Sequence, residues 1–182
     1  MPEAASRYTR HKCFISYQRD DADEVEAFIE EFDENGDIFI SRALGVAGQD
    51  LIDSNDSSYI MRAIRERFLR DSTVTIVMIG RCTWTRRFVD WEIASTLRND
   101  AQNKRSGLMA VTLPSVASET KTLPARLDDN WDARNLYARW WKYPDSADQL
   151  ARHIEDAHDA RDTRAGLIDN SRQLFGDNRN CM

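Results

Sequence analysis

The sequence predicts one α/β domain, in which a parallel sheet of about five strands carries helices on both faces. Short apolar, β-branched runs alternate with segments of helical periodicity along most of the chain. Such an alternating order favours parallel strands, because each strand returns through a right-handed helical crossover. A length of 182 residues, with 41% hydrophobic and 31% charged residues, is typical of a soluble domain with a proper core.

The first half of the chain alternates between strand and helix. Acidic residues open the first helix, where the helix dipole favours them, and Asn35-Gly36 ends it. Ile60, Ile64 and Phe68 recur with helical spacing in the second helix. The predicted segments are a strand over His11–Tyr17, a helix from Asp20 to Gly36, a strand over Asp37–Ser41, a loop over Leu44–Ser58, a helix over Ser57–Arg70 and a strand over Thr73–Ile79.

The second half of the chain continues the alternation of strand and helix, and this pattern becomes weaker toward the C-terminus. We expect a helix over Trp84–Arg98, a strand over Gly107–Leu113, a loop containing Pro114 and Pro124, a late strand over Trp140–Pro144 and a closing helix over Ser146–Ala160. Residues 1–10 form an N-terminal extension, residues 11–162 the domain, and residues 163–182 a weakly structured tail from which Leu174 and Phe175 are able to dock.

Composition and charge argue against several classes of protein. No apolar run approaches the roughly 18 residues of a membrane span, and the N-terminus lacks the apolar core of a signal peptide. A net charge of −6 argues against a general nucleic-acid binder. Cys13, Cys82 and Cys181 suggest neither a disulfide framework nor a zinc site, so a reducing cytoplasm is expected. The three scattered histidines give no metal signature.

The expected ligand site lies beyond the carboxyl ends of the strands, where the winding direction of the sheet switches. In a flavodoxin-like strand order, this point falls between the first and third strands. The loops Ser16–Asp21 and Gly80–Trp84 then face the crevice. The chain has no GxGxxG, GxxxxGK[ST], GxSxG or HExxH motif, which disfavours a Rossmann dehydrogenase or a P-loop enzyme.

Glu92 is the candidate catalytic acid. It lies two turns into the helix that leaves the third strand, in the stretch Cys82–Ile93. At about 100° per residue, it projects with Phe88, Val89, Ser95 and Thr96, whereas Arg86, Arg87, Asp90 and Arg98 fall on the opposite half of the helix. A carboxylate set beside apolar neighbours has a raised pKa, which suits acid, base or electrostatic catalysis. A structural acid bonded to the backbone is an equally weighted alternative.

Other candidate residues carry weaker signals. Asp20, Asp21 and Asp23 suggest a metal cluster, but a solvated helix start is the favoured interpretation. Trp84 and Trp91 lie seven residues apart, on one side of a helix, so core packing is favoured over stacking on a ligand ring. Ser16 and Tyr17, at the end of the first strand, either bond a ligand or cap the turn.

Five short segments occur in the order found in one known family. They are Phe14-Ile-Ser-Tyr17, Ser54-Asn-Asp-Ser57, Ile60-Met-Arg-Ala-Ile-Arg65, Thr75-Ile-Val-Met-Ile-Gly80 and Thr83-Trp-Thr-Arg-Arg-Phe-Val-Asp-Trp-Glu-Ile93. Over roughly residues 11–145 the chain resembles the TIR-like domains of bacteria. The likeness is closest to the TIR-like subunit of the Thoeris anti-phage system.

This resemblance implies a flavodoxin-like fold and an enzyme that cleaves the nicotinamide–ribose bond of NAD. NAD is then the substrate, and no separate cofactor is implied. Thoeris-type members convert NAD to a cyclic ADP-ribose isomer, a second messenger for a separate NAD-depleting effector protein. The family's catalytic glutamate matches Glu92. The substrate-binding positions implied are Phe14, Ser16, Tyr17, Asp53, Asn55, Trp84 and Trp91.

The chain also departs from the family pattern. The usual serine before the aromatic residue of the helix motif is replaced by Arg86 or Arg87. No fused effector module is visible, so any output passes through a diffusible product or a partner, and the resemblance further implies self-association. A non-catalytic TIR-like interaction module remains an alternative. A nucleotide receptor or response regulator is a third, although the third strand ends in Gly80 without a phosphoacceptor aspartate.

Overall fold

The sheet has five parallel strands in the order β2-β1-β3-β4-β5. The computed structural model describes residues 8–43, 56–101, 103–119, 121–131 and 137–182. The strands are β1 (His11–Ser16), β2 (Phe39–Ala43), β3 (Val74–Ile79), β4 (Gly107–Thr112) and β5 (Arg139–Trp141). The predicted flavodoxin-like α/β class is confirmed, and the switch point lies between β1 and β3, which are neighbours in the sheet.

Helices follow the strands in the expected alternation. The α-helices are α1 (Ala22–Ile29), α3 (Ser57–Ile64), α4 (Arg87–Leu97), α5 (Ala125–Trp131) and α6 (Ala147–Thr163). Short helical turns of 3-10 or π type extend or connect them: η1 (Arg19–Asp21), η2 (Glu30–Glu34), η3 (Arg65–Leu69), η4 (Thr83–Thr85), η5 (Pro114–Val116) and η6 (Ala165–Leu167). No helix in the described ranges is long and apolar enough to cross a bilayer.

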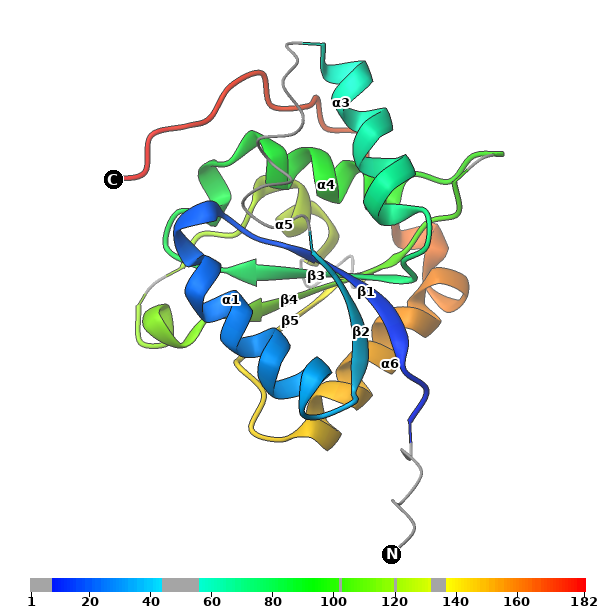
Figure 1. Cartoon of the computed structure of the whole chain (residues 1–182). Helices are drawn as coiled ribbons and strands as arrows, with labels where there is room; N and C mark the ends of the chain where they lie inside the picture. Colours follow the sequence, from blue (N-terminus) through cyan, green and yellow to red (C-terminus); the bar gives the residue numbers. More distant parts are fainter. Residues whose placement is uncertain (1–7, 44–55, 102, 120, 132–136) are drawn as a thin grey trace, which may run out of the picture.

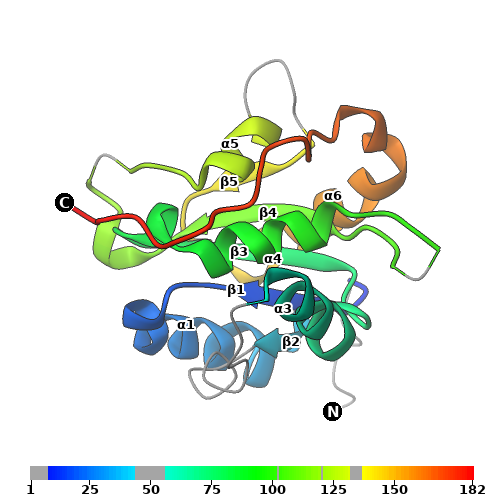
Figure 2. The same cartoon turned by 90° about the horizontal axis from the view of Figure 1, so that it is seen from above.

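The helices form two layers on opposite faces of the sheet, as Figures 1 and 2 show. In β1, Cys13 and Ile15 face the layer of α1 and α6, whereas Phe14 between them packs against α3 and α4. This alternation follows from the period of two along a strand. Both faces are therefore apolar, as is usual for a parallel sheet covered by helices.

Gly107 lets α6 approach the start of β4. A Cβ atom built at this position would lie 1.9 Å from the carbonyl oxygen of Ala157, which belongs to the helix backbone. Gly107→Ala should therefore push α6 away from the sheet and lower the free energy of unfolding by about 2 kcal/mol, as measured by urea denaturation. Gly166→Ala is the matched control, because no atom lies within 4 Å of its added Cβ. Equal stability of the two variants would contradict this packing.

Several element boundaries differ from the sequence predictions. Strand β2 starts at Phe39, two residues later than expected, and β5 covers Arg139–Trp141 instead of continuing to Pro144. The helix expected over Trp84–Arg98 is interrupted at Arg86, whose backbone is extended, so α4 begins at Arg87. Helix α5 falls directly after the loop predicted around Pro114 and Pro124, in a segment for which no helix was expected.

Candidate active site between β1 and β3

Glu92 and Ser16 meet in the interior between the two central strands. Ser16 is the last residue of β1, and Glu92 lies in the middle of α4, which follows β3. The Ser16 hydroxyl donates a hydrogen bond to Glu92 Oε2 at 2.5 Å. Both side chains are buried, with Glu92 only 2% exposed. The structure thus joins two predicted site residues that lie 76 positions apart.

Burial raises the pKa of Glu92 to about 8, and the hydrogen bond from Ser16 opposes this shift only in part. At pH values below about 8 the carboxyl group therefore keeps its proton for most of the time. The pKa of Tyr17 is also raised, first by burial and then by the charges of Glu26 and Glu92. Glu92 is consequently a desolvated carboxyl group, as expected of one that performs electrostatic work.

A cavity of about 300 Å³ opens beside this pair. Its volume is at the lower end of the range for small-molecule sites. Phe88 and Val89, one helical turn before Glu92, form part of its wall. The other lining residues are Tyr17, Gln18, Arg19, Asp20, Arg86 and Asn178. Aromatic, amide and guanidinium groups therefore surround the cavity, whereas Glu92 and Ser16 lie near its lining residues in the chain without lining it themselves.

Hydrogen bonds fix the polar wall of the cavity. Arg86 Nε donates to Gln18 Oε1 at 2.7 Å, and the Gln18 amide donates to Asp20 Oδ2 at 3.1 Å. Arg86 is one of the two positions at which the family serine is replaced. Asp21 follows Asp20 in the chain. Burial, and then the charges of Glu24 and Asp20, raise its pKa to about 6.

The C-terminal tail runs along α4 (Figures 1 and 2). It has no helix or strand beyond Leu167, but Phe175 is buried and its carbonyl accepts a hydrogen bond from Trp91 Nε1 at 2.9 Å. Asn178 Oδ1 accepts the backbone N–H of Arg87, the first residue of α4, at 3.0 Å. The suggestion that Phe175 docks is thereby confirmed. The tail also contributes Asn178 to the cavity, and no motif in the sequence indicated this role.

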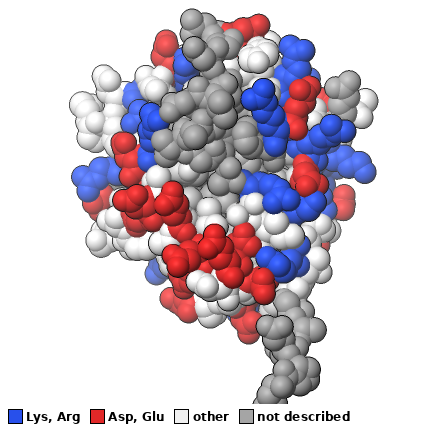
Figure 3. All heavy atoms as spheres, in the orientation of Figure 1, with Lys and Arg blue, Asp and Glu red and all other residues white. Residues whose placement is uncertain are grey.

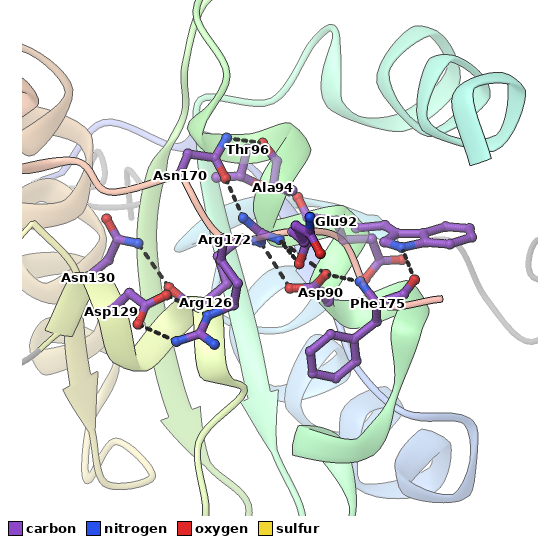
Figure 4. Close-up of polar contacts among 12 residues, drawn as sticks. Asp90, Glu92, Ala94, Thr96, Arg126, Asp129, Asn130, Asn170, Arg172 and Phe175 are labelled. Atoms are coloured by element: carbon purple, nitrogen blue, oxygen red, sulfur yellow. Dashed lines mark hydrogen bonds and ion pairs between the residues drawn. The ribbon is translucent and has the colours of Figure 1, made fainter. Parts of the chain in front are cut away.

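Asp90 lies on the half of α4 that the helical projection assigned to charged residues. Its side chain is buried and forms an ion pair with Arg126 of α5, with Nε and Oδ1 2.9 Å apart. Figure 4 shows Arg126 between Asp90 and Asn170, with the backbone N–H of Phe175 also directed at Asp90. Helix α5 and the tail therefore cover this half of α4 at Asp90, a contact that the helical projection did not address.

The cysteine prediction was wrong for one pair. Cys82, in the turn after β3, forms a disulfide with Cys181 of the tail, and their Cα atoms are 5.5 Å apart. Cys13 is a free, buried thiol in β1. A separation of 99 residues gives no spacing signal, so the sequence offered no means of finding this pair. The disulfide fastens the tail beside the loop that leads into α4.

The remaining predicted residues fall in different places. Phe14 is buried in the core with Trp91, so neither lines the cavity; Trp91 also packs against Phe88, with ring centroids 5.5 Å apart. Trp84 lies in the turn η4 before α4 and is half-buried. Asp53 and Asn55 lie outside the described residues.

The acidic helix start receives no support as a metal site. Among the described residues, the one group that brings three potential ligands together is His11, Glu155 and His158, far from Asp20 in the sequence. Arg161 already contacts Nε2 of His158, and the rings of His11 and His158 are stacked with centroids 4.0 Å apart. This cluster is accounted for by packing and ion pairing.

A second, larger cavity of about 720 Å³ lies at the opposite edge of the sheet. Its lining includes Trp140 and Trp141 of β5 and His153 of α6, together with residues of the adjoining loops. The smaller cavity has Phe88 and Val89 in its wall, one helical turn before Glu92, whereas the lining of the larger cavity includes no residue of α4. We therefore place the candidate active site at the smaller cavity, because chemistry depends on reactive groups more than on volume.

The Ser16 hydroxyl tunes the ionisation of Glu92 in this site. Ser16→Ala removes the hydrogen bond that favours the charged form, so the pKa of Glu92 should rise above its value of about 8. If ionised Glu92 is the active form, kcat/KM for substrate should reach its plateau at a higher pH than in the wild type. Ser171→Ala, at an exposed tail position, serves as control. An unchanged pH profile in Ser16→Ala would contradict the coupling.

Strand order and helical layers define a flavodoxin-like α/β domain, and Glu92 lies on the helix that follows its third strand. The family model described as Thoeris protein ThsB, TIR-like domain, matches residues 14–118, which is more than half of the chain. The chain therefore belongs to this family. No curated protein matched it. Membership of the Thoeris family supports a role in anti-phage defence.

Proposed function

We propose that this protein cleaves NAD at the nicotinamide–ribose bond as part of a Thoeris defence system. The observation that carries the proposal is Glu92, a buried carboxyl group with a pKa raised to about 8, bonded to Ser16 and placed one helical turn from the cavity wall. Family membership supports the same assignment, because the matched range includes Glu92.

The chemistry suits a single carboxylate. When the bond between C1′ of the ribose and the ring nitrogen breaks, nicotinamide leaves with the bonding electron pair and is neutral, so no acid is needed. The ribosyl group is left as an oxocarbenium-like cation. Ionised Glu92 would stabilise this positive charge and orient the attacking nucleophile. Water as nucleophile adds to C1′ and loses a proton, which yields ADP-ribose.

A cyclic product requires a nucleophile from the same NAD molecule. A ribose hydroxyl or an adenine nitrogen held against C1′ would replace water, and a dry cavity favours that outcome. The aromatic wall of Tyr17 and Phe88 supports such an environment. We propose a cyclic ADP-ribose isomer as the product, a separate effector protein as its receiver, and self-association as the step that completes the site.

Incubating the purified protein with NAD and analysing the products by mass spectrometry tests this function. Free nicotinamide with an equimolar ADP-ribose species is the expected result, and Glu92→Gln should form both about 100- to 1,000-fold more slowly. The assay needs a concentrated or crowded sample, because self-association is part of the proposal. Absence of turnover in the wild type under dilute, crowded and phage-challenged conditions would overturn it.

A non-catalytic TIR-like interaction module is the second candidate. The full burial of Glu92 and its bond to Ser16 favour this reading, since a satisfied internal acid can serve structure alone. Defence against phage in cells separates the two functions. If a folded Glu92→Gln variant still protects cells, the protein acts as an interaction module. If protection is lost, it acts as an enzyme.

A further inference from the structure

A basic cavity lies at the amino ends of β3 and β4, at the opposite end of these strands from Gly80 and the candidate active site. Its volume is about 370 Å³. Thr73 and Ser106, which immediately precede the two strands, contribute to its lining, and so does Ser95 near the end of α4. The cations that line it are Arg65, Arg70, Lys104, Arg105 and Arg161.

Among the residues that line this basic cavity, five cations face a single acid. Asp71 is the one acid in its lining, and its carboxylate is already bonded to Lys12 at 2.7 Å, with Arg42 at 3.6 Å. Within the described ranges, none of the five cations of the cavity forms an ion pair. The whole chain has a net charge of −6. Figure 3 shows the segregation: acids cover α1, and Lys and Arg gather around α3.

Internal contacts hold some of these guanidinium groups in place. Arg105 Nε donates to the carbonyl of Arg161 at 2.7 Å, and Arg161 Nε donates to the carbonyl of His158 at 2.9 Å. Arg65 Nη1 is buried and has no hydrogen-bond partner among the described residues. An unpaired buried donor is costly, so an acceptor at this place would be stabilising. Burial and the nearby Arg98 lower the pKa of Arg65. A bound anion would raise this pKa again.

We propose that the basic cavity binds a small molecule bearing a diphosphate group, such as a nucleoside diphosphate. Guanidinium groups bind phosphate oxygens through paired, charge-assisted hydrogen bonds. The cavity is within the size range of small-molecule sites, which favours a compact ligand over the extended backbone of a nucleic acid. The site is independent of NAD cleavage, because its residues are separate from those that line the cavity beside Glu92.

Isothermal titration calorimetry with inorganic pyrophosphate, ADP and adenosine tests the proposal. Pyrophosphate and ADP should bind and adenosine should not, since the diphosphate provides the recognition. The double variant Arg70→Glu with Lys104→Glu changes two exposed side chains of the lining. It should weaken pyrophosphate binding about tenfold or more, because two attractive charges become repulsive.

The control is Lys142→Glu with Arg152→Glu, which makes the same change in net charge at exposed positions outside this cavity. It should bind pyrophosphate as the wild type does. Equal weakening in both double variants, or no binding to the wild type, would overturn the site. Tighter binding of a single-stranded oligonucleotide than of ADP would overturn the small-molecule assignment. Measurements in the Glu92→Gln background should give the same affinities, whatever the outcome for NAD cleavage.

Discussion

Glu92→Gln is expected to lower the rate of nicotinamide release by about 100- to 1,000-fold, the usual cost of removing one preorganised electrostatic group. The same substitution should make the protein more stable than the wild type at about pH 8. In the folded wild type, the pKa of Glu92 lies near 8, whereas an exposed glutamate ionises near 4.5. Loss of activity with a gain of stability is the mark of a site whose burial serves function.

The sign of the stability change follows from proton uptake. Between about pH 4.5 and 8, the folded state keeps a proton on Glu92 that the unfolded chain has lost. The contribution of Glu92 to stability is therefore full below about pH 4.5 and declines as the pH rises through about 8. A pKa difference of one corresponds to about 1.4 kcal/mol, so the glutamine variant should gain about 2–4 kcal/mol at the alkaline end.

Urea unfolding of both proteins at about pH 5 and about pH 8 measures this effect. The two curves should nearly coincide at the lower pH and separate at the higher one. Glu155→Gln, which removes a half-exposed acid elsewhere, is the control for a general change in charge. A glutamine variant that is inactive and also less stable at both pH values would mean that Glu92 is a structural acid.

Arg126→Met is expected to destabilise the protein by about 3–5 kcal/mol, because it leaves the Asp90 carboxylate buried without its counter-charge. The pair is bidentate and nearly inaccessible, with side-chain exposures of 1% for Arg126 and 3% for Asp90. Arg126 also donates to the carbonyl of Gln173, and the N–H of Phe175 is the remaining donor to Asp90. The substitution should therefore also loosen the tail.

The exposed pair of Arg172 and Asp129 provides the matched control. It too joins a guanidinium group to a carboxylate through two hydrogen bonds, but its side chains are 41% and 24% exposed. Arg172→Met should cost less than about 1 kcal/mol. Adding Asp90→Asn to Arg126→Met should recover part of the loss by removing the buried charge. Equal effects of the two single arginine variants would refute the special role of the buried pair.

The sheet was predictable because its strands are chemically simple. Val74–Ile79 is a run of apolar residues with β-branched side chains, and its burial on both faces follows from helices on both sides. The proximity of Ser16 and Glu92 was also foreseen, since parallel strands bring their carboxyl ends to one edge and the switch point lies there. The raised pKa of Glu92 follows from its apolar neighbours.

The features that the sequence did not reveal depend on contacts between residues that lie far apart in the chain. The burial of Asp90 was not predicted, because its counter-charge, Arg126, lies 36 residues away in a helix whose segment was not expected to be helical. Asn178 enters the cavity wall through contacts of an irregular tail, which has no periodicity to detect. Cys82 and Cys181 pair across most of the chain. Predictions from periodicity and local motifs cannot find such contacts, because their energy arises only once the chain has folded.

The disulfide of Cys181 has a practical consequence for handling the protein. Because Cys181 is bound to Cys82 in the loop before α4, any chain continued beyond Met182 emerges next to the candidate active site. An affinity tag or fluorescent fusion at that end would be anchored there, close to Arg87 and the cavity. Assays of tagged protein would then report on the tag as well as on the protein itself. Labels are better introduced at the N-terminus, whose neighbouring strand β1 begins at the opposite end of the sheet from Ser16.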